Sequence, residues 1–548
     1  MFKRVAPAVA AIGILFFMIR CEIKNPAENL KLIISFSPVS TAVAVEVTDP
    51  RTQEYVPGEV TIRIEGPDRA FVVDETGKSL RTLTTSTGIV SFAISDEITP
   101  TPENPVSLFL VVEADGYLTT GKTVLIQDTE RQAVTVHLVS VQDPPPGAGA
   151  VTEQAGMTHP VSGTTASILI ETPRTTVADL SARVSILQNT LITDGNDEPL
   201  SGALTASVIH FSGGNTEALQ SFPGGLTAQL TGGSGGIEEG PFITAGFVSI
   251  EIRDESGKQA ERFDPPIVVT MELTSGQTDS TGKRIVTGDI VPIWSYDEQT
   301  GRWKQEGKGI ISGPNSNGRL YVEYTVRHLS FWQLGWFMRN HCLKSRKIVL
   351  DGWPEEYGGV YLTFSAAGYW RDTHVWGNNW TYLFHAPGFP VTIGAYAGGP
   401  RGTFLGSWTG RRLCEGGDLI LPVQIPAALQ NRMGKRIIHV SGICPGQERL
   451  DVRPTVPIWY RKETEANWTY AGMLKDGVLT INGLIFGQKY LFATRYEGQW
   501  YEAGFEINSD STLLIPEYSD RIHLDQIDGN HIYYSVDLPD SICDELNR

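Results

Sequence analysis

The sequence lacks the motifs that usually hold zinc or activate a nucleophile. Its ten histidines include no His-x-His or His-Glu-x-x-His motif, and its five cysteines include no Cys-x-x-Cys. Zinc sites commonly draw their ligands from such closely spaced pairs. No acid–base pair stands out either, so a hydrolase is the least favoured class. The sequence predicts a protein that is not an enzyme and needs no cofactor.

Positive charge is scarce. The chain has 44 Lys and Arg against 62 Asp and Glu, which gives a formal net charge of −18. Most of such a surface would repel a phosphate backbone, so nucleic acid is excluded as a partner. After the N-terminus no apolar run is long enough to cross a bilayer. At 548 residues, with 41% hydrophobic and 19% charged residues, the chain predicts several folded domains.

Tryptophan is absent from the N-terminal half, since all 12 lie between Trp294 and Trp500. The two halves must therefore differ in their cores or surfaces. Strand patterns occur in both. For example, Val60, Ile62 and Ile64 alternate with Thr61 and Arg63, a period of two that indicates a strand with one buried face. Frequent turns between short strands predict a mainly β fold of tandem antiparallel β-sandwiches, immunoglobulin-like or prealbumin-like.

The N-terminus has the layout of an export signal. Lys3 and Arg4 precede an apolar run over 5–19, and Cys21 follows. This pattern resembles a bacterial lipoprotein signal, which implies acylation of Cys21 and a membrane partner through the lipid. Arg20 departs from that pattern, in which a small residue precedes the cysteine. An uncleaved anchor, or an ordinary signal with a free cysteine, remains the alternative. Either way we expect export, to the cell surface or to the outer membrane or periplasm.

Without Cys21 an even number of cysteines remains. We predict that Cys342 pairs with Cys414 and Cys444 with Cys543, because each pair brackets one expected sandwich and export supplies oxidising conditions. A bond between Cys414 and Cys444 would contradict both pairings.

Three strings of the first domain suggest a known module. They are Val56-Pro57-Gly58-Glu59-Val60, the segment 86–92 (STGIVSF), and Val112-Glu113-Ala114-Asp115-Gly116-Tyr117. In this order they resemble carboxypeptidase-regulatory-like modules over residues 45–140. The resemblance implies a prealbumin-like sandwich of seven strands without catalysis of its own.

Two further strings lie downstream. Residues 294–303 read W-x-Y-D-x-x-T-G-x-W, and residues 326–332 read V-x-H-L-S-x-W. Over residues 190–336 the chain resembles the extracellular module of the astroprincin and cartilage intermediate layer protein families. This implies an extracellular β-rich domain, without indicating a reaction. The predicted organisation is a signal at 1–21, a tether at 22–30, a sandwich at 31–141, a Pro/Gly linker at 142–165, a β-rich domain at 166–340, a Trp-rich sandwich at 341–434 and a C-terminal sandwich at 435–548.

His328-Leu329-Ser330 is the sharpest candidate for chemistry. Autoproteolytic β-sandwiches cleave at such a string, where the histidine takes the serine proton and an N-to-O acyl shift breaks the preceding bond. The spacing would place His328 and Ser330 on one side of a strand. The following residues, 331–336, are apolar at both parities, which indicates a packed strand. We therefore expect the Leu329–Ser330 bond to stay intact.

Weaker candidates remain. The glycine-rich string 232–236 fits G-x-S-x-G, but no helix can follow it, so it predicts a turn. Asp194, Asn196 and Asp197 could supply oxygens to calcium, or form an ordinary turn.

The Trp-rich domain could bind a glycan or another surface protein through one or two exposed rings, whereas its other rings would fill the core. The ring candidates are Trp370, Trp376, Trp380 and Trp408. The favoured function is a structural or adhesion protein of the cell surface; carbohydrate or matrix binding and self-cleavage are the alternatives.

Overall fold

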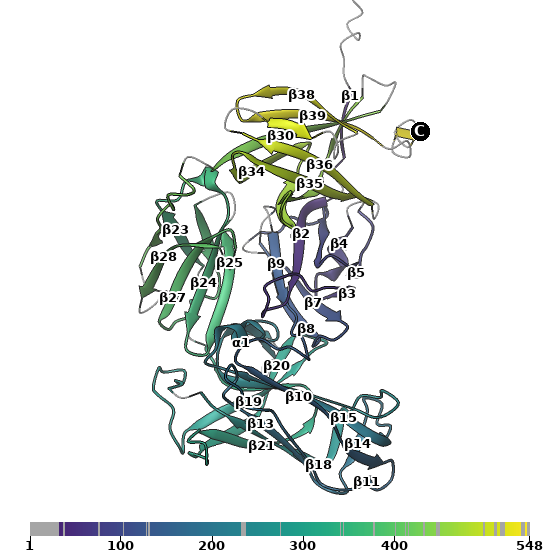
Figure 1. Cartoon of the computed structure of the whole chain (residues 1–548), viewed down its shortest axis with the longest axis vertical. Coiled ribbons are helices and arrows are strands. Elements are labelled where there is room, and N and C mark those ends of the chain that lie inside the picture. The colour runs from purple at the N-terminus through teal and green to yellow at the C-terminus, as the bar shows by residue number, and fades with distance from the viewer. Residues whose placement is uncertain are drawn as a thin grey trace, which may run out of the picture.

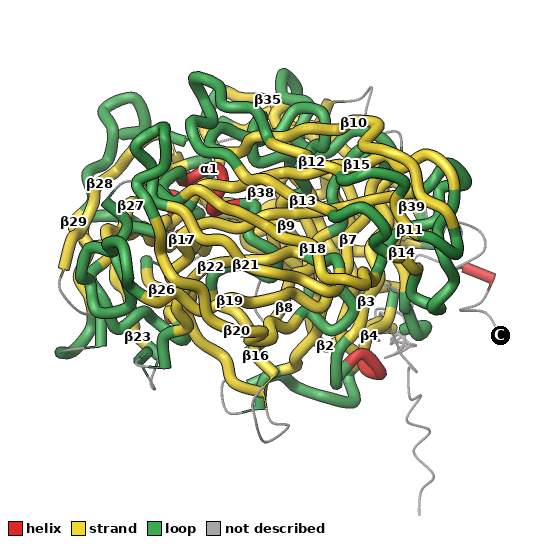
Figure 2. Tube along the Cα trace, turned by 90° about the horizontal axis from the view of Figure 1, so that it is seen from below, coloured by secondary structure: helices red, strands yellow, loops and turns green. Residues whose placement is uncertain are grey.

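The computed structural model describes residues 32–36 and 39–544, apart from short internal gaps. These gaps are at 37–38, 75–76, 102–103, 128, 130–131, 232–236, 275, 340, 343–344, 376–378, 400–401, 411–412, 415, 431–432, 445–449, 497–498, 509–511, 516–520 and 539–542. The predicted signal, Cys21 and the tether lie outside the described residues. Strands dominate the described part, which also holds the short α-helix α1 (Thr216–Gln220), the 3-10 helices η1 (Arg69–Phe71) and η2 (Glu355–Tyr357), and helical residues at 543–544 (Figure 2).

The predicted fold class is confirmed: the chain is mainly β and is built from sandwiches of largely antiparallel sheets. In the described residues, no helix has the length and apolarity that a membrane span requires.

The first unit (residues 39–141) is a sandwich of two four-stranded sheets, ordered β4-β6-β2-β9 and β5-β3-β7-β8. Val60, Ile62 and Ile64 are at most 1% exposed and lie in the shared core, so the alternation seen in the sequence has one buried face as predicted. The strands are β2 (Val39–Thr48), β3 (Val60–Glu65), β4 (Val72–Val73), β5 (Thr82–Thr85), β6 (Ile89–Ser95), β7 (Val106–Ala114), β8 (Thr120–Ile126) and β9 (Gln132–His137).

The second unit (residues 148–337) is one extended sheet that folds over two cores. Its order is β11-β10-β15-β17-β22-β19-β20-β21-β18-β13-β12, with β14 and β16 on side branches. The strands are β10 (Ala148–His159), β11 (Gly163–Thr164), β12 (Ile168–Glu171), β13 (Ala182–Ile186), β14 (Leu191–Thr193), β15 (Gly202–Ser212), β16 (Thr227–Thr231), β17 (Ile237–Arg253), β18 (Arg262–Glu272), β19 (Ile290–Asp297), β20 (Arg302–Ser312), β21 (Tyr321–His328) and β22 (Phe331–Phe337).

The predicted linker at 142–165 is wrong for most of its length. β10 runs through it and pairs antiparallel with β15, from Ala148 opposite Phe211 to Thr158 opposite Gly202. The strand was missed because its side chains are mostly small or polar and show no apolar alternation. Its backbone hydrogen bonds to β15 hold it in the sheet, so the second unit begins directly after the prolines.

The third unit (residues 342–423) is a sandwich of the sheets β26-β23-β29 and β25-β24-β27-β28. The Cys342–Cys414 disulfide closes it, as predicted. The strands are β23 (Arg346–Asp351), β24 (Val360–Ala366), β25 (Tyr369–Val375), β26 (Trp380–Leu383), β27 (Val391–Ala397), β28 (Thr403–Gly410) and β29 (Leu419–Pro422).

The fourth unit (residues 433–543) pairs the sheets β1-β31-β30-β39-β38, with β34 beside β30, and β33-β32-β35-β36-β37. The second predicted disulfide, Cys444–Cys543, is also present. The strands are β30 (Met433–Ile443), β31 (Leu450–Pro454), β32 (Val456–Lys462), β33 (Thr469–Leu474), β34 (Val478–Ile485), β35 (Gln488–Tyr496), β36 (Gln499–Ile507), β37 (Thr512–Ile515), β38 (Ile522–Asp528) and β39 (His531–Asp537).

Strand β1 (Leu32–Phe36) does not belong to the first sandwich, where the sequence placed it. It pairs parallel with β31, with Leu32 opposite Leu450 and Phe36 opposite Pro454. A local pattern predicts a strand but not its partner, and parallel partners can lie far apart in the chain. The first described strand is therefore part of the last unit.

The four units close into a ring, in which the first and third units lie between the second and the fourth (Figure 1). Phe109 of the first unit shares an apolar cluster with Tyr296 and Trp303 of the second. In the first and fourth units, Ala44 and Trp459 share another cluster. Each unit is thus held by two neighbours.

Two further junctions, between the second and third units and between the third and fourth units, require glycine. Gly368, in the third unit, accepts a hydrogen bond from the backbone of Thr244 in the second at 2.9 Å. Its φ is +72°, and a Cβ there would lie 2.3 Å from the Thr244 oxygen. Gly483, in the fourth unit, has φ +76° and approaches the third unit so closely that a Cβ would lie 2.7 Å from the Tyr357 oxygen. Only glycine fits both the conformation and the approach.

Candidate functional site

A cavity of about 850 Å³ lies where the four units meet. β8 and β9 border it from the first unit, β25 and β26 from the third, and residues of the second and fourth units complete the wall. The volume is within the usual range for ligand pockets, which often form between domains. This cavity is the candidate functional site of the described structure.

Edge strand β26 carries a row of aromatic rings into the cavity wall. Trp380 and Tyr382 have ring centroids 5.4 Å apart, and Tyr382 and Phe384 6.4 Å. Side chains alternate along a strand, so Trp380 and Tyr382 share one face of β26 while Leu383 is buried on the other, and Phe384 lies just beyond the end of the strand. Tyr382 is 46% exposed. The Trp380 and Tyr382 rings are inclined to each other by 72°, so each ring offers its own apolar surface to a ligand.

The structure places the four predicted ring candidates in different surroundings. Trp380 and Trp370 both line the cavity. Trp370 is buried, and its ring lies 6.1 Å from that of His137 in the first unit, so it also joins two units. Trp408 is half-buried against the apolar core and does not line the cavity. Trp376 lies outside the described residues.

The charged groups of the cavity are mostly engaged. Arg371 donates to the Phe384 carbonyl at 2.6 Å, and Asp372 accepts from the Tyr361 hydroxyl at 3.1 Å. Lys475 donates to the Thr129 carbonyl. Lys122 of β8 differs, because within the described chain its ammonium has no hydrogen-bond acceptor and no carboxylate partner. It is the cation available to a ligand.

Two histidines of the cavity wall, His137 and His385, are neutral at ordinary pH. Burial lowers the pKa of His137 to about 4, although Asp372 opposes this and Lys122 adds to it. Burial also lowers the pKa of His385 to about 4, with His341 and Arg371 acting in the same direction. These rings can accept or donate a hydrogen bond but contribute no charge.

His328 and Ser330 are not arranged for self-cleavage. β21 ends at His328 and β22 begins at Phe331, so the two residues do not share a strand as the spacing suggested. The Ser330 hydroxyl donates to the Tyr296 carbonyl and accepts from the Tyr296 N–H at 3.1 Å. His328 instead stacks near Trp332, with ring centroids 4.9 Å apart. Both side chains therefore hold β19, β21 and β22 together.

We expect Ser330→Ala to cost about 1–2 kcal/mol of stability, because it removes the hydroxyl that bonds both backbone groups of Tyr296. His328→Ala should cost about 1 kcal/mol through the lost ring contact. Neither change should alter chain length, which intact mass would show. Two fragments separating near residue 330 in the parent protein, and abolished by Ser330→Ala, would instead establish self-cleavage.

The calcium candidate is a hydrogen-bonded turn. Asp194 Oδ1 accepts from the backbone N–H groups of Asn196 and Glu198, each at 2.9 Å. Lys258 lies 3.7 Å from the other Asp194 oxygen, and Arg262 pairs with Asp197. Among the described residues, no group of three or more candidate ligands could hold a metal ion. The carboxylates of this turn already have cationic partners.

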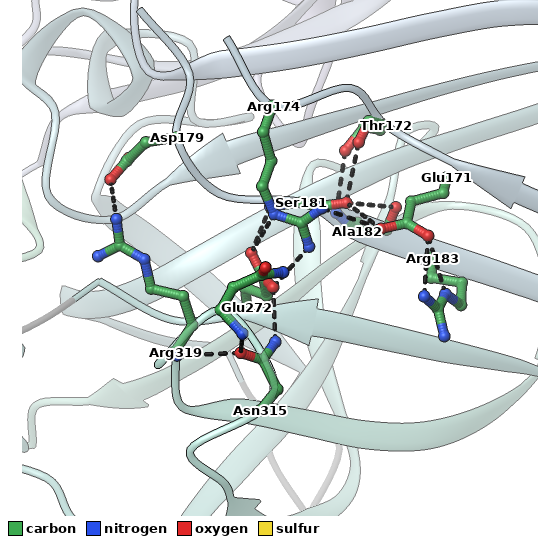
Figure 3. Close-up of polar contacts among 11 residues, drawn as sticks. Glu171, Thr172, Arg174, Asp179, Ser181, Ala182, Arg183, Glu272, Asn315 and Arg319 are labelled. Carbon is green, nitrogen blue, oxygen red and sulfur yellow. Dashed lines mark hydrogen bonds and ion pairs between the residues drawn. The ribbon is translucent and has the colours of Figure 1, made fainter. Parts of the chain in front are cut away.

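A second set of carboxylates, Glu171 on β12 and Glu272 on β18, does not line the cavity, and its polar contacts are drawn in Figure 3. Glu272 is almost fully buried and accepts from Arg174 at 2.6 and 3.1 Å, from Asn315 at 2.6 Å and from the Ser181 N–H at 3.0 Å. Burial alone would raise the pKa of Glu272, but these donors together hold it below its usual value. A fully bonded carboxylate suits structure rather than proton transfer.

Glu272→Gln should lower the free energy of unfolding by about 2–3 kcal/mol at pH 7, because it weakens charged hydrogen bonds in a buried place. Since the folded pKa is below the unfolded value of about 4.3, the ionised form stabilises the fold above that pH, and this stability is lost as pH falls through the folded value. The difference in the free energy of unfolding between the parent protein and the variant should therefore be smaller at pH 3 than at pH 7. Urea unfolding at the two pH values measures it. Glu238→Gln, at an exposed pair with Arg339, is the control and should change stability by less than about 1 kcal/mol. An equal difference at both pH values for Glu272→Gln would contradict the assignment.

Sequence reasoning missed Lys122, His137, Asp372 and the cavity itself. Lys122 and His137 belong to the first unit and Asp372 to the third, and nothing local marks them as neighbours. The one available signal was the aromatic series Trp380, Tyr382, Phe384, whose first two rings share one face of β26.

No protein-family model matches the sequence, and no curated protein matches it. Solved structures give distant similarities. The C-terminal fragment of the pilus adhesin SpaC from Lactobacillus rhamnosus GG matches with 7% identity and a TM-score of 0.15, over 36% of this chain and 100% of that one. BcpA, the major pilin subunit of Bacillus cereus, matches with 8% identity and a TM-score of 0.15, over 91% of this chain and 98% of that one. The full-length major pilin SpaD from Corynebacterium diphtheriae matches with 8% identity and a TM-score of 0.12, over 91% and 96%. All three are pilins or pilus adhesins, but TM-scores this low establish no relationship to this chain.

Proposed function

We propose that this is an exported, non-enzymatic protein of the cell surface with a structural or adhesive role, tethered by a lipid on Cys21. The observation that carries the proposal is the pair of disulfides, Cys342–Cys414 and Cys444–Cys543, each within one β unit. Structural disulfides form and persist in oxidising compartments. The layout of Lys3, Arg4, the apolar run and Cys21 supplies the route out of the cytoplasm.

The ring supports a structural role. Each unit has its own core and also packs on two neighbours. A force applied to one unit is therefore transmitted to the units that it contacts. The candidate chemical groups are committed to structure: Ser330 to the backbone of β19, Asp194 to its turn and Glu272 to Arg174. Such a body suits holding a surface away from a membrane.

The test follows the full-length chain in a bacterial host. We expect the parent protein in the membrane fraction and accessible to protease added to whole cells, and Cys21→Ser should release it. Arg20→Ala is the matched control, because a small residue before the cysteine should leave membrane attachment intact or strengthen it. A parent protein that stays in the cytoplasm, or a Cys21→Ser variant that stays membrane-bound with residues 1–20, would contradict the proposal.

Carbohydrate binding is the second candidate function, and the exposed aromatic row of β26 favours it. Sugar rings present C–H faces that pack on flat aromatic surface, while neighbouring polar groups bond their hydroxyls. Binding of the purified chain to immobilised glycans, reduced by Trp380→Ala, would support this function.

A further inference from the structure

We propose that the cavity between the four units binds a short acidic oligosaccharide, with sugar rings stacked on Trp380 and Tyr382 and an acidic group facing Lys122. This inference rests on the proposed position at the cell surface, where such chains are encountered, and it deepens the second candidate function.

The aromatic row supplies the stacking surface. Alternate residues of a strand are about 6.6–7 Å apart, and the Trp380 and Tyr382 rings are inclined by 72°, so with Phe384 just beyond the strand they form a step-like row rather than a single platform. Lys347 lies over the Trp380 ring, 4.8 Å from its centroid. Tyr382 is 46% exposed in this wall, which leaves ring surface open to a ligand. A linear chain of rings matches this row better than a compact molecule does.

The polar part of the wall suits sugar hydroxyls. It is rich in uncharged groups, among them Thr381, Gln127 and Gln220. Gln220 accepts from Gln53 at 2.9 Å, which fixes its amide at the border of the first and second units. Hydroxyl and amide groups can both donate and accept, as a polyhydroxylated ligand requires.

Charge decides between a neutral and an acidic ligand. The protein carries a net charge of −18, yet the wall brings three cations, Lys122, Arg371 and Lys475, against Glu239 and Asp372. Asp372 is bonded to Tyr361, and Glu239 lies 3.6 Å from His385. Lys122 has no partner in the described chain, so a ligand carboxylate or sulfate would complete its coordination.

The experiment measures binding of the full-length chain by calorimetry. The probes are a galacturonic acid pentamer, the same pentamer as its methyl ester, and a sulfated galactan pentamer. We expect the acid to bind at least about tenfold more tightly than its ester, equivalent to ~1.4 kcal/mol. Comparison of the two acidic probes tells whether the preferred group is carboxylate or sulfate.

Variants locate the site. Trp380→Ala should weaken binding of acid and ester alike, whereas Lys122→Met should weaken only the acid and remove its advantage. Trp500→Ala and Lys308→Met are the controls, since both residues lie outside the cavity and should leave affinity unchanged. Thermal unfolding of each variant checks that the fold persists.

Three results would overturn the inference: no binding of any probe, equal binding of acid and ester, or loss of affinity in the control variants to the same extent as in the cavity variants. Protease accessibility on whole cells tests the surface location independently. Failure of glycan binding with intact surface exposure therefore rejects the site and leaves the structural function standing.

Discussion

Replacing Cys342 and Cys414 together by alanine should destabilise the third unit by about 4–5 kcal/mol. The disulfide closes a loop of 72 residues, and the loss follows from the loop-closure entropy restored to the unfolded chain. The free energy of a single domain is itself only about 5–15 kcal/mol, so the third unit should become marginal. Hydrogen exchange of peptides between 346 and 423, with and without the substitutions, measures the effect unit by unit.

The control for this prediction is the second disulfide. Cys444→Ala with Cys543→Ala should leave exchange in the third unit largely protected while exposing the fourth, because its loop of 99 residues lies there. Adding a reductant to the parent protein should reproduce both patterns together. Unchanged exchange in the third unit after removal of Cys342 and Cys414 would show that its two sheets and its neighbours hold it without the bond.

Trp303→Ala should cost about 3–5 kcal/mol, the usual loss for a large aromatic ring removed from a core. Trp303 is fully buried, with ring centroids 4.9 Å from Phe222, 5.0 Å from Tyr296 and 6.0 Å from Phe242. The void left by the missing indole would lie in the apolar cluster that the first and second units share. Both units should therefore lose stability. Urea unfolding followed by fluorescence and by exchange measures the loss.

Trp303→Phe is the matched variant. The indole N–H of Trp303 is buried without a hydrogen-bond partner in the described protein, and phenylalanine removes it while keeping most of the ring area. The relief of an unsatisfied donor, worth about 1–3 kcal/mol, should offset part of the lost packing. Trp303→Phe should thus be clearly more stable than Trp303→Ala. A loss for Trp303→Phe as large as the loss for Trp303→Ala would contradict this prediction.

Local patterns in the sequence predicted what depends on local physics. Val60, Ile62 and Ile64 alternate because one face of β3 is buried, and patterns of this kind gave the mainly β class. The disulfides were predictable because each pair brackets one compact unit. Strand β10 was not predicted because its small side chains show no periodic apolar pattern. Its place in the sheet comes from backbone pairing with β15.

The cavity could not be predicted for a different reason. Lys122, Glu239, Trp380 and Lys475 belong to four units, and they meet only because the units close into a ring. That closure depends on contacts such as Thr244 with Gly368, where backbone meets backbone and no side-chain pattern marks the partner. The partner of β1 was hidden in the same way, since neither Leu32 nor Leu450 reveals the other.

The pairing of β1 with β31 also determines the order in which the chain can fold during synthesis. β1 leaves the ribosome before β31, whose residues follow about 420 positions later in the sequence. At ~5–20 residues per second, roughly 20–80 s pass before β31 has been made. Throughout that interval β1 is a strand with unpaired edges, open to pairing with any neighbouring chain. Correct assembly therefore depends on whatever shields the nascent N-terminal segment, such as a holding chaperone, until the last unit arrives to accept it.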